Sequence, residues 1–312
     1  MRVLSLFSGI GGLDQGFIDA GYDIVWANDF DKYAVETYKA NYDTEIVHGD
    51  INDIPLESLP QFDVLIGGFP CQPFSMMGSE RGFEDTRGTL FFRIAEIINY
   101  KIEQNEKPRV VILENVRTLR THDRGRTFKK IKSVMEEDLG YKVFDEVLNS
   151  ANYGVPQTRN RTYIVCFANE NAEFRFPETE PLNLTLQDLL QENVDDKYFL
   201  SDRILPTILS DGTGGYKAKS EIDLKIARPL CATMAKMHRA CQDNYVTQNG
   251  RVRRLTPREC ARLQGFDDDF VIPVSDSQAY KQFGNAVTVN VAREVAMSVR
   301  NTLEELGEWN VE

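Results

Sequence analysis

The sequence has few cysteines, no long apolar run and a deficit of positive charge, and each shortage excludes a class of protein. Its 312 residues include five cysteines, an odd number with no CxxC pair, which argues against a disulfide framework or a structural zinc site. No apolar stretch approaches the roughly 20 residues that span a membrane, and the apolar N-terminal run breaks at Ser8-Gly9, unlike a signal peptide. We therefore expect a cytoplasmic protein without a metal or a membrane partner.

Charge is distributed unevenly along the chain. A formal net charge of −12 argues against a general polyanion binder. Residues 228–262 nevertheless hold eight Lys and Arg residues and only two acidic ones. The eight are Arg228, Lys236, Arg239, Arg251, Arg253, Arg254, Arg258 and Arg262. This segment is either a local nucleic-acid surface or an ordinary solvated face, and the acidic remainder of the chain makes the local excess more telling.

Strand-like and helix-like segments alternate through the first two-thirds of the chain. The expected strands are RVLSLF, DIVWAND, EIVHGD, FDVLIGGFP, RVVILENV and RTYIVCFA. Helical patterns lie between them, for example over 12–22, 31–42, 90–104 and 128–141. This order predicts an α/β fold with a Rossmann-like, mostly parallel sheet, in which ligands bind at the carboxyl ends of the strands.

The alternation of strand-like and helix-like segments ends after about residue 175. Pro-rich FRFPETEPLNL and turn-rich DGTGGYKAKS show no clean alternation of elements. The last segment, TVNVAREVAMSVRNTLEEL, again fits a helix, with valines stacked every four residues. We predict a catalytic domain of residues 1–178 plus 284–312 and a second, smaller and irregular domain of residues 179–283.

The first strand leads into a glycine turn, FSGIGG, at residues 7–12. Glycines there let a ligand approach the backbone, but a GxGxxG pattern would need glycine where Asp14 stands. A carboxylate disfavours a pyrophosphate, so a cofactor without phosphates is expected. Asp29 suits ribose hydroxyls and Asp50 an adenine amino group, although either is equally a cap or turn residue.

The sharpest signal is GGFPCQPFS at residues 67–75. Cys71 lies between Pro70 and Pro73, so it belongs to a rigid, non-helical loop at the ligand edge of the sheet. A thiolate nucleophile fits such a position better than a structural cysteine does. His48 and His122, the histidines of this domain, lack a recognisable Cys-His protease context.

Six blocks together resemble the DNA cytosine-5 methyltransferases, in the order usual for that family. They are FSGIGG, GGFPCQPFS, ENV at 114–116, QTRNR at 157–161, RRLTPRECARLQGF at 253–266 and GNAVTVNV at 284–291. The resemblance covers nearly the whole chain apart from about 175–250, and the compact length resembles the bacterial restriction-modification members. It implies S-adenosylmethionine as cofactor and double-stranded DNA as substrate.

The resemblance also implies catalytic roles. Cys71 would attack cytosine C6, Glu114 would bond N3 and the exocyclic amine, and Arg159 or Arg161 would contact O2, with Arg161 favoured. An ion-paired structural glutamate and a surface arginine pair are the plainer alternatives. The base that removes the C5 proton is not identified, and water is a candidate. The target cytosine would be flipped out of the duplex.

Further residues carry over by their motifs. The cofactor residues implied are Phe7, Gly9, Gly11, Asp29, Phe30, Asp50, Ile51, Pro70, Leu90 and Asn285. Segment 76–90 resembles a mobile catalytic loop, with Ser75 and Arg87 as phosphate contacts. The family keeps target recognition within 179–252, where Thr233-Met234 resembles a Thr-Leu element. Lys236 and Arg239 are further DNA-contact candidates.

The expected biological setting is a restriction-modification system, with a monomeric enzyme and a cognate endonuclease as functional but unbound partner. Three alternatives stay open. The first is a transfer-RNA methyltransferase on the same scaffold, the second a nicotinamide-dependent oxidoreductase using FSGIGG, and the third a non-catalytic DNA-binding relative. Asp14 and the Pro-Cys-Gln-Pro loop argue against the second, and intact Cys71 and Glu114 argue against the third.

Overall fold

The computed structural model describes residues 1–70, 90–210, 221–236, 238 and 242–309. Backbone contacts divide the chain into two units. The first comprises Met1–Leu148, Asn160–Glu178 and Ala292–Glu312, and the second comprises Asn149–Arg159 and Thr179–Val291. Two short segments that the sequence analysis assigned to the catalytic domain, Asn149–Arg159 and the stretch from 284 to 291, group with the second unit.

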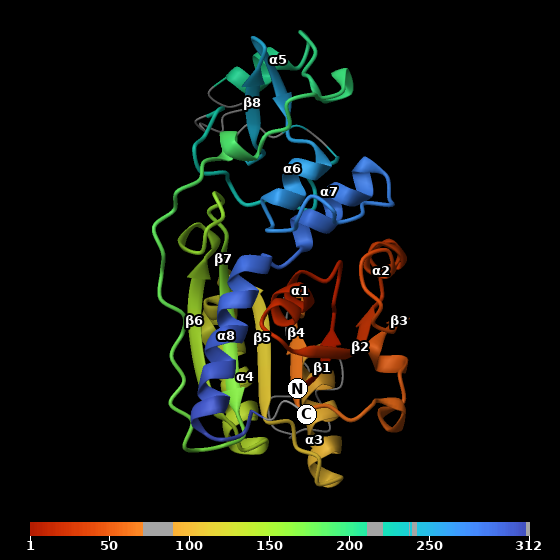
Figure 1. Ribbon diagram of the computed structural model, residues 1–312, viewed down its shortest axis with the longest axis vertical. Coiled ribbons are helices and arrows are strands. Elements are labelled where there is room, and N and C mark those ends of the chain that lie inside the picture. The colour runs from red at the N-terminus through yellow and green to blue at the C-terminus, as the bar shows by residue number, and fades with distance from the viewer. Residues whose placement is uncertain (71–89, 211–220, 237, 239–241, 310–312) are drawn as a thin grey trace. The chain divides into compact units, whose positions relative to one another are not determined.

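The first unit is built on a seven-stranded sheet of order β3-β2-β1-β4-β5-β7-β6 (Figure 1). The strands are β1 (Arg2–Leu6), β2 (Asp23–Asp29), β3 (Ile46–His48), β4 (Val64–Gly67), β5 (Val110–Val116), β6 (Lys142–Asn149) and β7 (Asn160–Phe167). Strands β1 to β5 pair in parallel, whereas β7 runs antiparallel to β5. The predicted α/β fold with a mostly parallel sheet is confirmed, and β6 is a strand that the sequence analysis did not expect.

Helices cover this sheet because their apolar faces match its buried strands. They are α1 (Gly12–Asp19), α2 (Lys32–Lys39), α3 (Leu90–Glu103), α4 (Arg126–Ser133), which continues as a π-turn over Val134–Asp138, and α8 (Val289–Glu305). One large core cluster joins residues of β1, β4, β5 and β7 to the buried side of α3. Helix α1 packs directly on α8 (Figure 1), because a Cβ at Gly16 would lie 2.5 Å from that of Ala292.

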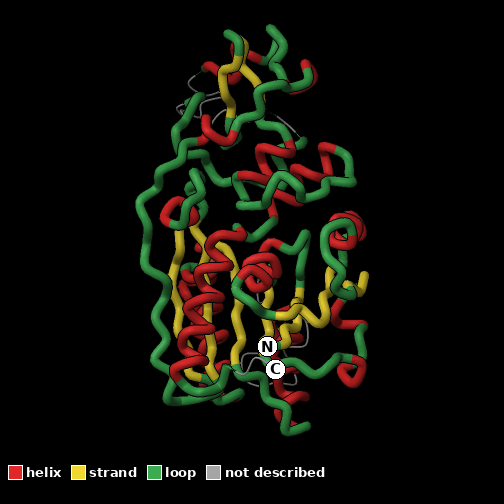
Figure 2. The backbone as a smooth tube through the Cα atoms, viewed as in Figure 1, coloured by secondary structure: helices red, strands yellow, loops and turns green. Residues whose placement is uncertain are grey.

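The second unit is mostly loop, with short helices and one hairpin (Figure 2). Its hairpin joins β8 (Tyr245–Gln248) to β9 (Arg251–Arg254) through Asn249-Gly250, both at positive φ, as an Asn-Gly two-residue turn requires. Its α-helices are α5 (Leu205–Leu209), α6 (Pro257–Arg262) and α7 (Asp276–Asn285). Single-turn 3-10 helices occur in both units, including Ile51–Asp53, Leu56–Ser58, Arg117–Arg120, His122–Gly125, Ser150–Asn152, Leu186–Leu189 and Asp196–Tyr198.

Within the described ranges, no helix combines the length and the apolar composition that crossing a membrane requires.

A buried carboxyl group lies in the first turn of α1. Asp14 has no exposed surface, and neither of its carboxyl oxygens makes a hydrogen bond of good geometry to a described residue. Burial raises the pKa of this carboxyl to about 7, and the Ser5 hydroxyl offsets only part of that effect. Asp14 is therefore neutral over much of the acidic pH range, and over that range it carries no charge that would repel phosphates.

Asp14→Asn should stabilise the folded chain at pH 8 and change it little at pH 3, where the carboxyl is protonated in both the folded and the unfolded chain. Between about pH 4 and pH 7 the folded state keeps a proton that the unfolded chain has lost, so stability falls as pH rises through that window. The gain at pH 8 should be on the order of 4 kcal/mol. Urea unfolding at several pH values measures it, with Asp19→Asn, an exposed carboxylate on the same helix, as control. A gain in the free energy of unfolding that does not vary with pH would refute the raised pKa of Asp14.

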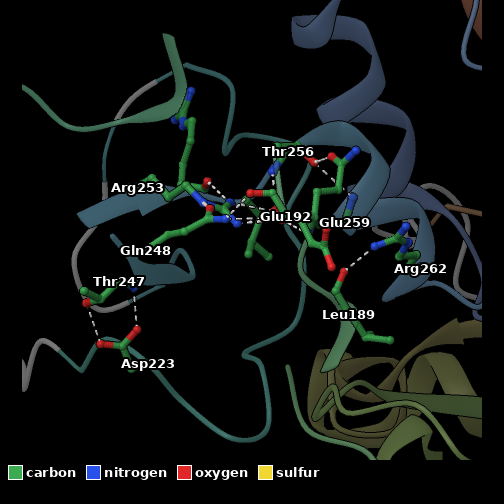
Figure 3. A network of polar contacts seen from close by, with 12 residues as sticks. Leu189, Glu192, Asp223, Thr247, Gln248, Arg253, Thr256, Glu259 and Arg262 are labelled. Carbon is green, nitrogen blue, oxygen red and sulfur yellow. Dashed lines mark hydrogen bonds and ion pairs between the residues drawn. The ribbon is translucent and has the colours of Figure 1, made fainter. Parts of the chain in front are cut away.

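A buried ion pair organises the second unit (Figure 3). Arg253 and Glu259 both have fully buried side chains and form two parallel hydrogen bonds of 2.8 and 2.7 Å. Arg253 also donates to the Gln248 side chain, and Glu259 accepts from the backbone N–H groups of Thr256 and Gln191. The Thr256–Glu259 pair is a capping box that starts α6. The Arg253–Glu259 pair thereby connects the β8–β9 hairpin, helix α6 and the loop that contains Gln191.

Glu259→Gln should lower the free energy of unfolding by about 3–5 kcal/mol, because the buried guanidinium loses its counter-charge. Urea denaturation checks this. Replacing both partners, as Arg253→Met with Glu259→Leu, should cost less than Glu259→Gln alone.

The matched control is the ion pair made by Arg262, the last residue of the same helix. Arg262 pairs with Asp268 at 2.7 Å, but that carboxylate is 64% exposed, so Asp268→Asn should cost less than about 1 kcal/mol. Equal losses from Asp268→Asn and Glu259→Gln would show that burial does not set the strength of these pairs.

Candidate active site

The site of the first unit lies where the strand order of the sheet reverses. Strand β1 sits between β2 and β4, and Leu6 at its end pairs in register with Gly67 at the end of β4. The turn that begins at Phe7 and the segment that leads to Pro70 therefore start side by side. Open parallel sheets bind ligands at this kind of edge.

The glycine turn has the backbone that its sequence requires. Phe7, Gly9 and Gly11 all have positive φ values, of 55°, 58° and 85°. A left-handed phenylalanine is uncommon and marks a constrained turn. A Cβ at Gly11 would lie 2.3 Å from the Tyr42 ring, whereas one at Gly9 would meet no described atom within 4 Å. Gly9 thus borders open space at the surface of the turn.

Asp29 joins this turn to the end of β2. One of its carboxylate oxygens accepts from the Gly9 N–H at 2.8 Å, and the other accepts from the Asp31 N–H at 2.8 Å. The residue is 8% exposed. A carboxylate offers about four acceptor positions, so these contacts are compatible with further bonds to ribose hydroxyls. The next residue, Phe30, is 73% exposed, an unusual state for an aromatic ring and one that suits a flat ligand stacked on it.

The turn after β3 carries Asp50 and Ile51. Asp50 is exposed and caps the 3-10 helix Ile51–Asp53, accepting from the Asn52 backbone N–H and side chain at 2.9 and 2.8 Å. Ile51 is buried in the main core cluster. Asp50 therefore acts as a turn residue, one of its two expected roles, and its exposure leaves the ligand role compatible with the structure.

The other expected cofactor residues lie on separate elements. Pro70 is exposed just after β4, and Leu90 is half-buried at the start of α3. Asn285 is exposed at the end of α7, in the second unit. Buried Asp29, exposed Phe30 and the open side of Gly9 together fit a nucleoside.

Glu114 and Arg161 form an ion pair at the carboxyl end of β5. Arg161 Nε lies 3.1 Å from Glu114 Oε1, and the two side chains are 20% and 9% exposed. The pairing arises because β7 runs antiparallel to β5, so that Arg161 at its start is opposite Val116 near the end of β5. The structural alternative for Glu114, an ion-paired residue, is thus present, and the pair also offers a carboxylate and a guanidinium in one place.

Asn115, which follows Glu114 in the ENV motif, was not among the site residues predicted from the sequence. Its buried side chain donates to the Phe69 carbonyl oxygen at 2.8 Å. This bond ties the segment that leads to Cys71 to the end of β5, directly beside Glu114. The sequence could not have predicted this contact, because the partner of Asn115 is a backbone carbonyl group 46 residues away and any residue type could supply it.

Arg159 differs from its expected setting. It directly precedes β7 and is 2% exposed in the second unit, so it is not part of a surface arginine pair. Its guanidinium donates to the carbonyl oxygens of Leu230, Gly284 and Ala286 at 3.0, 3.0 and 2.8 Å. These contacts hold three backbone segments together, which is a supporting function.

Four predicted site residues, Cys71, Ser75, Arg87 and Arg239, lie outside the described residues. Thr233 and Lys236 are exposed on a turn of the second unit, whereas Met234 between them is buried. The Arg254 guanidinium donates to the Met234 carbonyl oxygen at 2.9 Å and so fixes this turn. The Thr233 and Lys236 side chains are therefore accessible to solvent.

Much of the positive charge of 228–262 is paired with acidic residues. Arg253 pairs with Glu259 and Arg262 with Asp268. Further ion pairs join Arg228 to Glu221 and Arg251 to Asp196. The ordinary structural reading thus accounts for several of the eight residues.

Metal-ligand clusters of three or more His, Cys, Asp or Glu side chains do not occur in the described part of the chain. The described cysteines Cys166, Cys231 and Cys260 are free thiols, and Cys166 is fully buried as its apolar strand suggests.

Comparison with known proteins bears on the whole chain. A model of the family described as C-5 cytosine-specific DNA methylase matches residues 1–301. Type II methyltransferase M.NlaX of Neisseria lactamica is 40% identical over 324 aligned residues, covering 99% of each chain. Type II methyltransferase M.HhaI of Haemophilus parahaemolyticus is 38% identical, covering 97% of this chain and 95% of that protein.

Solved structures agree on the fold. A DNMT2 variant of Spodoptera frugiperda superposes with a TM-score of 0.77 at 19% identity, covering 96% of this chain and 99% of that one. Dnmt2 methyltransferase of S. pombe gives 0.77 at 21% identity, covering 98% and 99%. The resemblance seen in the six sequence motifs is confirmed, and the chain belongs to the C-5 cytosine-specific DNA methylase family.

Proposed function

We propose that the chain methylates carbon 5 of a cytosine within a specific short sequence of double-stranded DNA, with Cys71 as nucleophile. The observation that carries the proposal is the Glu114–Arg161 pair at the end of β5, held beside the segment that leads to Cys71 by the Asn115–Phe69 bond. A carboxylate and a guanidinium lie together at this sheet edge, and with the Cys71 thiolate they are the groups that activation of a pyrimidine ring needs.

The chemistry starts from the weakness of cytosine C5 as a nucleophile. Addition of the Cys71 thiolate to C6 forms an S–C6 bond and moves the ring electrons to C5, which then acts as an enamine-like carbon. C5 would then take the methyl group of the cofactor, whose S–CH3 bond breaks with its electrons kept by the sulfur, which becomes a neutral thioether. C5 now carries both the methyl group and its original proton. A base, or water, removes that proton, the C5–C6 double bond re-forms, and the thiolate leaves. Each turnover thus returns Cys71 unchanged.

Glu114 and Arg161 act on the opposite edge of the ring from C5. Glu114 in its protonated form would donate to N3, and its second oxygen would accept from the exocyclic amine, so the charge that develops on thiol addition is stabilised. Arg161, 3.1 Å from that carboxyl group, is suited to donate to O2. Arg159, occupied by three backbone carbonyls, serves as a positioning residue instead.

The cofactor would lie along the carboxyl ends of β1 to β4. S-adenosylmethionine, when bound, supplies an electrophilic methyl group on a sulfonium. Asp29 would hold the ribose hydroxyls, Phe30 would stack on the adenine, and Asp50 and Ile51 would border its amino edge. Phe7, Gly9, Gly11, Pro70, Leu90 and Asn285 would complete the contacts.

The DNA side of the proposal rests on the second unit and the loop after Cys71. Thr233, Lys236 and Arg239 would contact the DNA in the recognition segment, while Ser75 and Arg87 would hold phosphates as the loop closes over the flipped base. We further propose a monomeric cytoplasmic enzyme that protects host DNA in a restriction-modification system, with a cognate endonuclease that acts on the same sequence without binding the enzyme.

Cys71→Ser should abolish methylation of host plasmid DNA, because the hydroxyl cannot replace the thiolate as the nucleophile. Bisulfite sequencing after expression reads the modified base and its sequence context. Cofactor binding, measured by calorimetry, should persist in the variant. Cys166→Ala, which removes a fully buried thiol, is the control and should keep activity.

Full methylation by Cys71→Ser would refute the nucleophile assignment. Incubation with labelled cofactor and either duplex DNA or transfer RNA separates the DNA reaction from the RNA alternative. Label in the RNA alone would overturn the substrate.

Duplex DNA with 5-fluorocytosine at the target should form a covalent adduct with the chain. Fluorine at C5 cannot leave as a proton does, so the enzyme is trapped after methyl transfer with its S–C6 bond intact. A shifted band on denaturing gels measures the adduct, which should be missing in Cys71→Ser. Turnover without any adduct would contradict a covalent pathway.

A further inference from the structure

The turn after β3 has little structure of its own. Strand β3 has three residues and lies at the edge of the sheet, and the 3-10 helix that follows is a single turn. Short edge strands and one-turn 3-10 helices are weakly held by their own hydrogen bonds. The geometry of Asp50 and Ile51 must therefore be imposed by contacts from elsewhere in the first unit.

One such contact comes from α3. Arg93, in the first turn of that helix, donates from Nε to the Ile51 carbonyl oxygen at 3.1 Å and from a terminal nitrogen to the Ile54 carbonyl oxygen at 2.5 Å. Its other terminal nitrogen pairs with Glu96 at 2.7 Å. The Arg93 side chain is only 10% exposed. A planar guanidinium can bridge two carbonyls of one turn in fixed geometry, which a lysine ammonium cannot match.

A second contact holds the other side of the turn. Asn28, near the end of β2 and 1% exposed, donates from its side-chain amide to the carbonyl oxygens of Val47 and Gly49 at 2.9 and 3.0 Å. Asp50 thus lies between two pairs of held carbonyls. Its neighbour Ile51 has its side chain in the core and its carbonyl on Arg93.

We propose that Arg93 is a positioning residue for the adenosine end of the cofactor, acting through the Asp50–Ile51 turn. This inference rests on the function proposed above for that turn. Helix α3 also begins at Leu90, a proposed cofactor contact. The same helix thus carries Leu90 and, through Arg93, supports the Asp50–Ile51 turn. Arg93 itself touches the backbone of the turn and not the base, so its effect falls on cofactor affinity rather than on the chemical step.

Arg93→Ala should weaken binding of S-adenosylhomocysteine about tenfold in calorimetry, as expected when charge-assisted hydrogen bonds that order a binding turn are lost. KM for S-adenosylmethionine should rise by a similar factor, while kcat at saturating cofactor stays near that of the unaltered chain. Hydrogen exchange should speed up at the amides of residues 49–54 and remain unchanged in β5.

Glu96→Gln is the matched control. It removes the ion pair at a carboxylate that is 52% exposed but leaves both carbonyl contacts of Arg93, so cofactor affinity should change less than twofold. Arg93→Lys, which can reach one carbonyl at a time, should give an intermediate loss. If Arg93→Ala does not fold, Arg93→Gln decides the question by the same measurements: its amide nitrogen reaches only as far as Arg93 Nε, so it keeps a donor for the Ile51 carbonyl and loses the contact with Ile54, and cofactor affinity should fall.

Unchanged affinity in Arg93→Ala, or a fall in kcat with KM unaltered, would overturn the inference. The proposed function fails separately, since it requires that the unaltered chain bind the cofactor and methylate DNA. A chain that binds S-adenosylhomocysteine through an Arg93-dependent turn yet leaves DNA unmodified would uphold the inference and reject the function.

Discussion

The parallel pairing of β1 with β4 is the constraint on which the site of the first unit depends. Because the strands run in the same direction and Leu6 is in register with Gly67, the glycine turn and the segment leading to Cys71 leave the sheet side by side. Strands β2 and β3 continue the parallel pattern on one flank and bring Asp29 and Asp50 to the same edge. Backbone hydrogen bonds alone thus bring the starts of these two segments together, before any side chain contributes.

The antiparallel strand β7 adds a further side chain to the edge that the parallel strands form. An antiparallel neighbour starts at the edge where parallel strands end, so β7 brings its first residues to the carboxyl end of β5. Arg161 meets Glu114 for this reason. Had β7 been parallel to β5, its first residues would lie at the opposite edge of the sheet, and the guanidinium would be a strand length away. The antiparallel direction of β7 is therefore what allows Arg161 to reach Glu114.

Sequence patterns predicted the elements whose burial is continuous and missed those whose burial is mixed. Strands such as β4 and β5 are buried along nearly their whole length and read as apolar runs, whereas β6 alternates irregularly between exposed and half-buried positions. The charged hairpin strand β9 gave no apolar signal because its one fully buried residue is Arg253. Cys71, Glu114 and Asp29 could be proposed as site residues from the sequence because a thiol or a carboxylate at the end of an apolar strand is an informative residue type. Asn28, Arg93 and Asn115 could not, because each acts on backbone carbonyls that leave no trace in residue type.

Buried guanidinium groups recur as the means by which this chain fixes its loops. Arg93 holds the turn after β3, Arg159 holds three segments of the second unit, and Arg253 ties its hairpin to α6. In each case a loop carbonyl or carboxylate that would otherwise need water gains a charged donor, which is stronger than a neutral one. The arginines that fix these loops are for that reason engaged within the protein, so a count of basic residues overstates the number of side chains that a polyanion could contact. In a chain of net charge −12, the placement of the exposed basic side chains therefore matters more than their number.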